Sequence, residues 1–214
     1  MNKNARHGVV PLLLFVCFLV PLGVWSWNHP YDRLTWWLEV FPALAGLVVL
    51  AWTFSRFPLT RLAYVLIALH MAVLLVGGHY TYAREPVFEM LKDYYGWDRN
   101  HYDRLGHFFQ GFVPAIVARE ILVRRGVVRS AGWLYFIVVS ICFSISAGYE
   151  LFEWLTALAE GSKADDFLGS QGDPWDTQED MACALVGANA SLILLSGLHN
   201  RQLLALASPA PRRG

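Results

Sequence analysis

The sequence predicts an all-α membrane protein, a polytopic bundle of about six transmembrane helices in a single integral membrane domain covering residues 1–214. Two observations predict this class. The chain is 56% hydrophobic and only 16% charged, whereas soluble domains are about a quarter charged. In addition, apolar stretches of about twenty residues, the length a helix needs to cross a bilayer, recur along the chain. The net charge of zero, without a basic stripe, excludes a nucleic-acid partner.

Six stretches are long and apolar enough to be transmembrane spans. They lie near residues 8–26, 36–54, 61–81, 103–123, 132–158 and 179–199. The fourth is the least apolar, because it opens with DRLGHFFQG and closes with Arg119 and Glu120. The first follows Lys3 and Arg6 and so resembles a secretory signal, but Pro11 and Pro21 interrupt it and no small-x-small cleavage site follows. An uncleaved first helix is therefore expected.

The distribution of basic residues predicts the orientation. When alternate loops are assigned to alternate sides, 11 of the 17 basic residues fall on one side and 6 on the other. Because positive loops stay in the cytoplasm, both termini are expected there, with a disordered cytoplasmic tail over residues 202–214. The outer loop at 84–102 carries apolar residues at a helical period, which predicts a short amphipathic helix on the membrane surface.

Ionisable side chains gather at the predicted outer ends of the last three spans. Each span presents a pair of them three or four residues apart, so that the two members of a pair share a helix face. The pairs are Asp103 with His107, Glu150 with Glu153, and Asp176 with Asp180. Carboxylates with one imidazole form a ligand set for Mg, Mn, Fe or Zn, and facing helices of a bundle commonly build such sites. The expected metal ligands are therefore Asp103, His107, Glu150, Asp176 and Asp180.

Helix capping is an alternative explanation for the aspartates. Asp173 before Pro174 reads as an N-cap, and Thr177 with Asp180 resembles a capping box. This explanation does not extend to Glu150 and Glu153, which lie at the C-terminal end of an apolar span, where the helix dipole disfavours negative charge. A carboxylate inside the membrane costs roughly 2.5–3.5 kcal/mol at the bilayer centre and by default marks a site or a pathway.

Three segments carry a resemblance to a known family. YDRLGHFFQGFVPAIVAREIL, SAGYELFEW and FLGSQGDPWDTQEDM resemble the YjdF-like inner-membrane proteins of bacteria, whose function is not established, and the resemblance covers nearly the whole chain. It implies a location in the bacterial inner membrane. The order of an aspartate and histidine, an intramembrane glutamate and two further aspartates is also similar, more loosely, to VanZ-like membrane proteins.

These features predict an outward-facing metal site that hydrolyses a lipid or envelope substrate. Glu153 is expected to act as general base on a metal-bound water. A proton- or cation-coupled transporter is the first alternative, since intramembrane carboxylates also serve that use. With these spans, the inner halves of the same helices are expected to offer a pathway only Ser140, Ser144, Ser146, Ser191 and Ser196, which favours a one-sided site. A scaffold without catalysis is the second alternative.

Overall fold

The computed structural model describes residues 11, 13–160 and 165–207, and within them the chain is built of helices. The order is a π-helical turn η1 (Phe15–Leu19), α2 (Val20–Trp27), α3 (Arg33–Thr53), α4 (Arg61–Tyr80), a 3-10 turn η2 (Tyr82–Arg84), α5 (Pro86–Tyr95), α6 (Tyr102–Arg124), α7 (Ala131–Glu160), α8 (Asp165–Leu168) and α9 (Asp176–Ala207). The expected all-α membrane fold is confirmed.

Four of these helices, α3, α4, α7 and α9, are long and apolar enough to cross a membrane. They correspond to the second, third, fifth and sixth predicted spans. Helix α6 has 23 residues but is less apolar than these four, since it carries several ionisable residues that are buried inside the bundle. Of the first predicted span, residues 8–10 and 12 lie outside the described part of the chain, and the remainder forms η1 and α2. Residues 202–207, expected to be a disordered tail, instead continue α9, and 208–214 lie outside the described residues.

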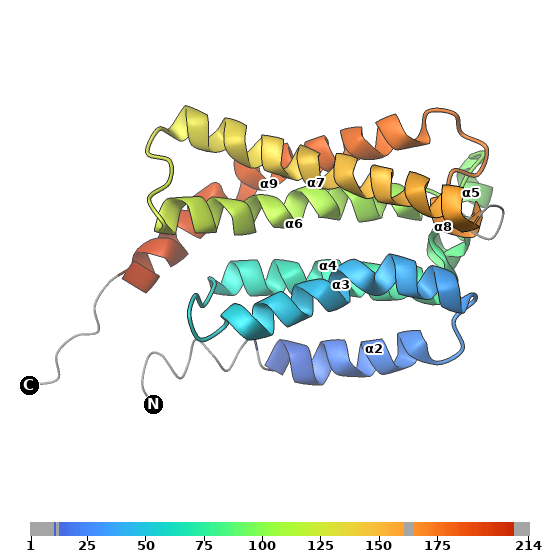
Figure 1. Cartoon of the computed structure of the whole chain (residues 1–214), viewed down its shortest axis with the longest axis horizontal. Helices are drawn as coiled ribbons and strands as arrows, with labels where there is room; N and C mark the ends of the chain where they lie inside the picture. The colour runs from blue at the N-terminus through green and yellow to red at the C-terminus, as the bar shows by residue number, and fades with distance from the viewer. Residues whose placement is uncertain (1–10, 12, 161–164, 208–214) are drawn as a thin grey trace, which may run out of the picture.

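The long helices run side by side in two groups, α2 with α3 and α4, and α6 with α7 and α9 (Figure 1). The helices of the two groups are roughly parallel or antiparallel, so the bundle as a whole has two ends. The connections from α3 to α4 and from α6 to α7 lie at one end, which we call the turn end. Helices α5 and α8 and the segment before α9 lie at the other, which we call the site end. Helix α5 confirms the short helix expected at 84–102; Glu85 caps it by accepting a hydrogen bond from the Phe88 N–H at 2.9 Å.

Helices α6 and α9 approach each other very closely. A Cβ atom added to Gly111 of α6 would lie 1.8 Å from the Ala184 carbonyl oxygen, and one added to Gly187 of α9 would lie 2.0 Å from that of Phe108. Only glycine permits backbones to approach this closely, and small residues serve the same purpose in membrane helix interfaces generally. The two glycines therefore fix the spacing between the helices that carry Asp103, His107 and Asp180.

Candidate functional site

Helix α6 contributes an aspartate and a histidine at the site end. The Asn100 side chain receives a hydrogen bond from the Tyr102 N–H at 3.0 Å and so ties down the first turn of the helix. Asp103 and His107 follow one turn apart, both buried, with His107 Nε2 3.6 Å from Asp103 Oδ1. On the other side of the ring, His107 Nδ1 lies 3.1 Å from Gln110 Oε1. With its proton on Nδ1 the imidazole donates to Gln110, and Nε2 faces the carboxylates with a free lone pair.

Helices α7 and α9 bring two more carboxylates to the same point. Asp180 of α9 offers an oxygen that lies, with one ligand atom each from Asp103 and His107, inside a group whose members are all within 4.8 Å of one another. Glu150 of α7 approaches from the third side, with Oε1 3.5 Å from His107 Nε2. Three helices thus converge on His107, and we call Asp103, His107, Glu150 and Asp180 the buried cluster.

Two oxygens of the buried cluster lack hydrogen-bond partners among the described residues. They are Glu150 Oε1 and Asp180 Oδ1, both inaccessible from outside the chain. A buried acceptor without a partner costs about 1–3 kcal/mol, and more if it is charged. Glu153, one turn beyond Glu150, is also buried and lies within electrostatic range of Asp103, Glu150 and Asp180. The cluster thus holds more negative charge and more free lone pairs than the surrounding described side chains satisfy.

A network of arginines and carboxylates lies beside the buried cluster. Arg99, itself buried, pairs with Asp176, lies 3.4 Å from Asp173 Oδ2 and donates to the Gly169 carbonyl at 3.1 Å. Arg104 donates to Asp173 Oδ2 at 2.7 Å and pairs with Glu179. The backbone N–H of Trp175 and the neighbouring arginines hold the pKa of Asp173 below its usual range. These contacts join the segment before α6 to the start of α9.

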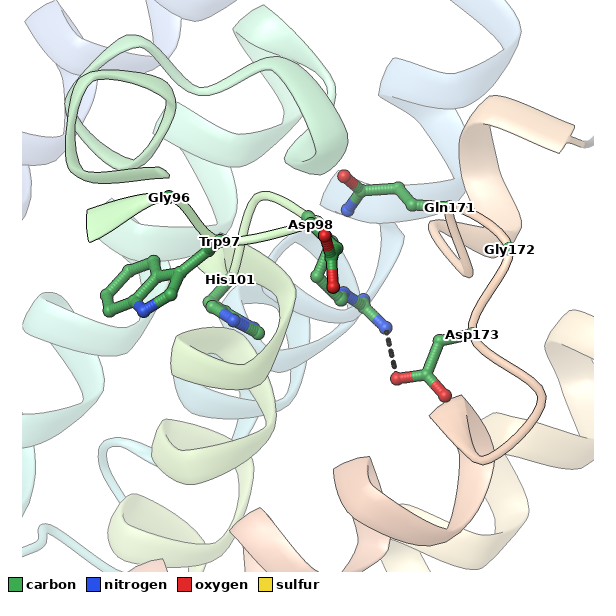
Figure 2. A pocket seen from close by; sticks show the side chains of 8 residues that line it. Gly96, Trp97, Asp98, His101, Gln171, Gly172 and Asp173 are labelled. Atoms are coloured by element: carbon green, nitrogen blue, oxygen red, sulfur yellow. Dashed lines mark hydrogen bonds and ion pairs between the residues drawn. The ribbon is translucent and has the colours of Figure 1, made fainter. Parts of the chain in front are cut away.

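The arginine network forms one wall of an open pocket of about 490 Å³ at the site end. Figure 2 shows Trp97 and His101 on one side of this pocket and Gln171 and Asp173 on the other. Gln171 bridges the two segments, because it accepts from the Asn100 N–H at 2.9 Å and donates back to the Asn100 carbonyl at 2.9 Å. Partial burial, with nearby arginines, lowers the pKa of His101. Polar and aromatic groups therefore line a recess next to the arginine network.

The structure brings most of the predicted ligands together in one cluster and turns one of them to an arginine beside it. Asp103, His107, Glu150 and Asp180 converge, as their shared helix faces predicted. Asp176, also predicted as a ligand, is instead turned to Arg99, because that arginine enters from the segment before α6. Asp173 does not cap α9, which begins three residues later at Asp176; its Oδ1 accepts from the Trp175 N–H in a turn at 2.9 Å.

Arg99 and Arg104 were not among the predicted site residues. A signal for them existed, because the predicted outer side holds 16 of the 17 acidic residues but only 6 of the 17 basic ones. Basic residues within that side were therefore the natural partners of the excess carboxylates. Arg99 precedes α6 and Arg104 lies in its first turn. These positions do not indicate which carboxylate each arginine pairs with.

A second buried polar cluster lies at the turn end. Glu120 is completely buried and accepts from the Thr60 hydroxyl at 2.7 Å, from Arg124 Nη1 at 2.8 Å and from His199 Nε2 at 3.1 Å. Arg119 donates to His199 Nδ1 at 3.0 Å, which leaves the imidazole proton on Nε2, facing Glu120. The expectation that the inner half offers only serines was therefore wrong, because Glu120 and His199, at the ends of the fourth and sixth predicted spans, turn into the bundle.

Comparisons with known proteins match the sequence to one family. Residues 11–201 match the family model described as "Predicted membrane protein (DUF2238)". The chain is 54% identical over 173 residues to the "Inner membrane protein YjdF" of Escherichia coli strain K12, covering 81% of this chain and 83% of the relative. No solved structure matches the chain. These matches agree with the YjdF-like resemblance and do not show the VanZ-like one. The chain belongs to the DUF2238 family of predicted membrane proteins.

Proposed function

We propose that this inner-membrane protein binds a divalent metal ion in the buried cluster and uses it to hydrolyse a lipid or envelope substrate. The observation that carries the proposal is the convergence of Asp103, His107 and Asp180, with ligand atoms within 4.8 Å of one another, beside Glu150. Two of these residues supply oxygens that have no partner among the described side chains. Both oxygens are available to a cation.

The charge balance supports a cation in this position. Five carboxylates at the site end, those of Asp103, Glu150, Glu153, Asp176 and Asp180, are each less than 9% exposed. Arg99 neutralises one of them through its pair with Asp176. Burying a charge without a partner is strongly unfavourable, so the remaining carboxylates require either protons or a metal ion. A divalent ion satisfies the free oxygens and compensates two charges at once.

The ligand set limits the choice of metal and of chemistry. Carboxylate oxygens with a single imidazole suit Mg, Mn, Fe or Zn, and the Gln110 contact fixes the tautomer that exposes Nε2 of His107. A metal in such a site lowers the pKa of bound water and so supplies a nucleophile near neutral pH. Glu153, buried next to the cluster and outside the proposed ligand group, is the residue that we assign as general base.

Metal analysis of the purified protein tests the binding step. We expect stoichiometric divalent metal in the wild type and its loss in Asp180→Asn and Glu150→Gln, because each change keeps the shape of the side chain but removes a ligand charge. Asp173→Asn is the matched control, since Asp173 contacts arginines and a backbone N–H rather than the cluster. A wild type without metal, or ligand variants with wild-type metal content, would refute the proposal.

A separate measurement tests hydrolysis. Metal-loaded protein in vesicles of phosphatidylethanolamine and phosphatidylglycerol should release a lipid fragment that mass spectrometry detects. Glu153→Gln should keep the metal and lose the release. If both proteins leave the lipids intact, these two lipids are excluded as substrates, while the proposed metal binding is unaffected. Equal release by both proteins would show that Glu153 is not the general base.

Proton or cation transport is a second candidate, and the turn-end cluster favours it. Glu120 and His199 place titratable groups about 25 Å from Asp103 along α6, since seventeen residues at 1.5 Å each separate Asp103 from Glu120. His70 of α4 lies between the two ends. Ion flux into vesicles containing the protein would distinguish the two functions: a one-sided hydrolytic site predicts no flux above that of empty vesicles.

A further inference from the structure

An apolar groove opens halfway along the bundle, where the two helix groups meet. Its volume is about 440 Å³, and α3, α4, α6 and α7 form its walls. Fifteen of its sixteen lining residues are apolar, with His70 as the exception. The walls include Pro42 and Gly46 of α3 and Pro114 of α6, and Gly46 adds no side chain to the space between the helices. This groove shares no lining residue with the buried cluster or with the pocket at the site end.

The rim of the groove is part of the outer surface of the bundle. Val49 of α3, Ile121 of α6 and Ile145 of α7 line the groove and are 55%, 43% and 44% exposed. Two of these helices, α3 and α7, are among the four that are long and apolar enough to span the membrane. At this depth the surroundings are hydrocarbon rather than water. The groove is therefore continuous with the surface that the protein presents to lipid.

We propose that this groove is a binding site for one hydrocarbon chain of a bilayer lipid. Lipid chains surround the rim, and an unfilled apolar space would lose the dispersion contacts that close packing provides. The walls are contributed by four different helices, so a chain that enters contacts both helix groups at once. A lipid held in this way differs from the lipids that exchange freely around the bundle, because it fills a space between helices.

The position of Gly46 provides a way to close the groove. A Cβ at this residue would meet only the Met71 Cε atom, at 3.5 Å, which is ordinary contact, so larger side chains can project into the space without a backbone clash. Gly46→Phe should therefore fill the groove. Gly148→Phe is the matched control, because Gly148 lies in α7 with nothing within 4 Å of an added Cβ and outside the groove.

The experiment uses phosphatidylcholine with a photoreactive diazirine in its acyl chain, reconstituted with the full-length protein in vesicles. Cross-links are mapped by mass spectrometry in the wild type and in the variants Gly46→Phe and Gly148→Phe. We expect cross-links on buried groove residues such as Met71 and Val113 in the wild type and in Gly148→Phe. In Gly46→Phe we expect them to fall about tenfold, which corresponds to about 1.4 kcal/mol of lost affinity.

Two outcomes would overturn the proposal. Equal cross-linking of groove residues in Gly46→Phe and Gly148→Phe would show that the labelled lipid contacts only the outer surface. Absence of lipid labelling of the groove residues in the wild type, together with a dimer captured by a protein–protein cross-linking reagent in the same vesicles, would show that a second copy covers the groove. Thermal unfolding shows whether each variant is folded. If Gly46→Phe fails to fold, Ala118→Phe, which fills the same groove from α6, replaces it.

Discussion

Replacing Gly187 with alanine tests whether the close approach of α6 and α9 sets the geometry of the buried cluster. The added Cβ would lie 2.0 Å from the Phe108 carbonyl oxygen and 3.0 Å from the Phe112 nitrogen. A carbon and a carbonyl oxygen normally come no closer than about 3.3 Å. Because both opposing atoms belong to the backbone, no side chain can move aside. The two helices must therefore separate by about 1.3 Å, the difference between these distances.

The separation should reduce both stability and metal binding. Overpacking of this kind costs about 1–3 kcal/mol, against which the better helix propensity of alanine returns about 0.5–1 kcal/mol. Gly187 follows Asp180 by two helical turns on the same face, and Phe108 is adjacent to His107 in α6, so the shift reaches the cluster. Metal ligands must be placed within about 0.2 Å, so a shift of about 1.3 Å should prevent binding at the proposed metal site.

The assay measures the unfolding temperature and the bound metal of Gly187→Ala beside Gly148→Ala. The control adds the same methyl group to α7, where nothing lies within 4 Å of it. We expect the unfolding temperature of Gly187→Ala to fall by about 2–4 °C for each kcal/mol lost, and that of Gly148→Ala to stay the same or rise. If the two variants unfold at the same temperature and carry the same metal, the close approach does not control the cluster.

Three further predictions concern other parts of the chain. In a background without Cys17, Cys142 and Cys183, Tyr94→Cys in α5 should react with an impermeant reagent on intact cells and Val127→Cys at the turn end should not; the reverse pattern would contradict the orientation. Glu120→Gln should destabilise the protein by about 3–5 kcal/mol, because it removes the charge that pairs buried groups, and thermal unfolding would measure this; a loss below that of Asp173→Asn would refute the structural role of Glu120. His101 has a lowered pKa in the folded protein, so its contribution to stability is complete above its unfolded pKa of about 6.5 and is lost as the pH falls through the folded value. His101→Gln should therefore reduce the fall in unfolding temperature below about pH 6.5, and an unchanged pH profile would count against this assignment.

The sequence was enough to locate the long helices and to select the four residues of the buried cluster, but not the arginines beside it. Local periodicity is sufficient to pair site residues on one helix, since residues four apart share a face, as Asp103 and His107 do. The depth of Glu150 in an apolar span marked it as a site residue, because burying a carboxylate there is costly. What brought α6 and α9 together at these residues was the glycine pair Gly111 and Gly187, whose role depends on a partner helix that local pattern does not identify.

The pairing of charges was beyond sequence reasoning. Asp176 was predicted to be a metal ligand, whereas its pairing with Arg99 depends on how the segment before α6 folds against the one before α9. That fold relies on backbone conformations such as the positive φ of 64° at Gly169, whose carbonyl accepts from Arg99. Likewise, Glu120 and His199 meet across 79 positions of the chain, a separation over which periodicity gives no guidance.

The contribution of α9 to the buried cluster has a consequence for biosynthesis. Asp180 is made after Asp103, His107 and Glu150, so a nascent chain that has inserted α6 and α7 lacks one member of the buried cluster. Until α9 docks against α6, the carboxylates of the earlier helices must be protonated or exposed to water in the insertion machinery. Under the proposed function, cation binding therefore waits for the last stage of assembly, when α9 supplies Asp180.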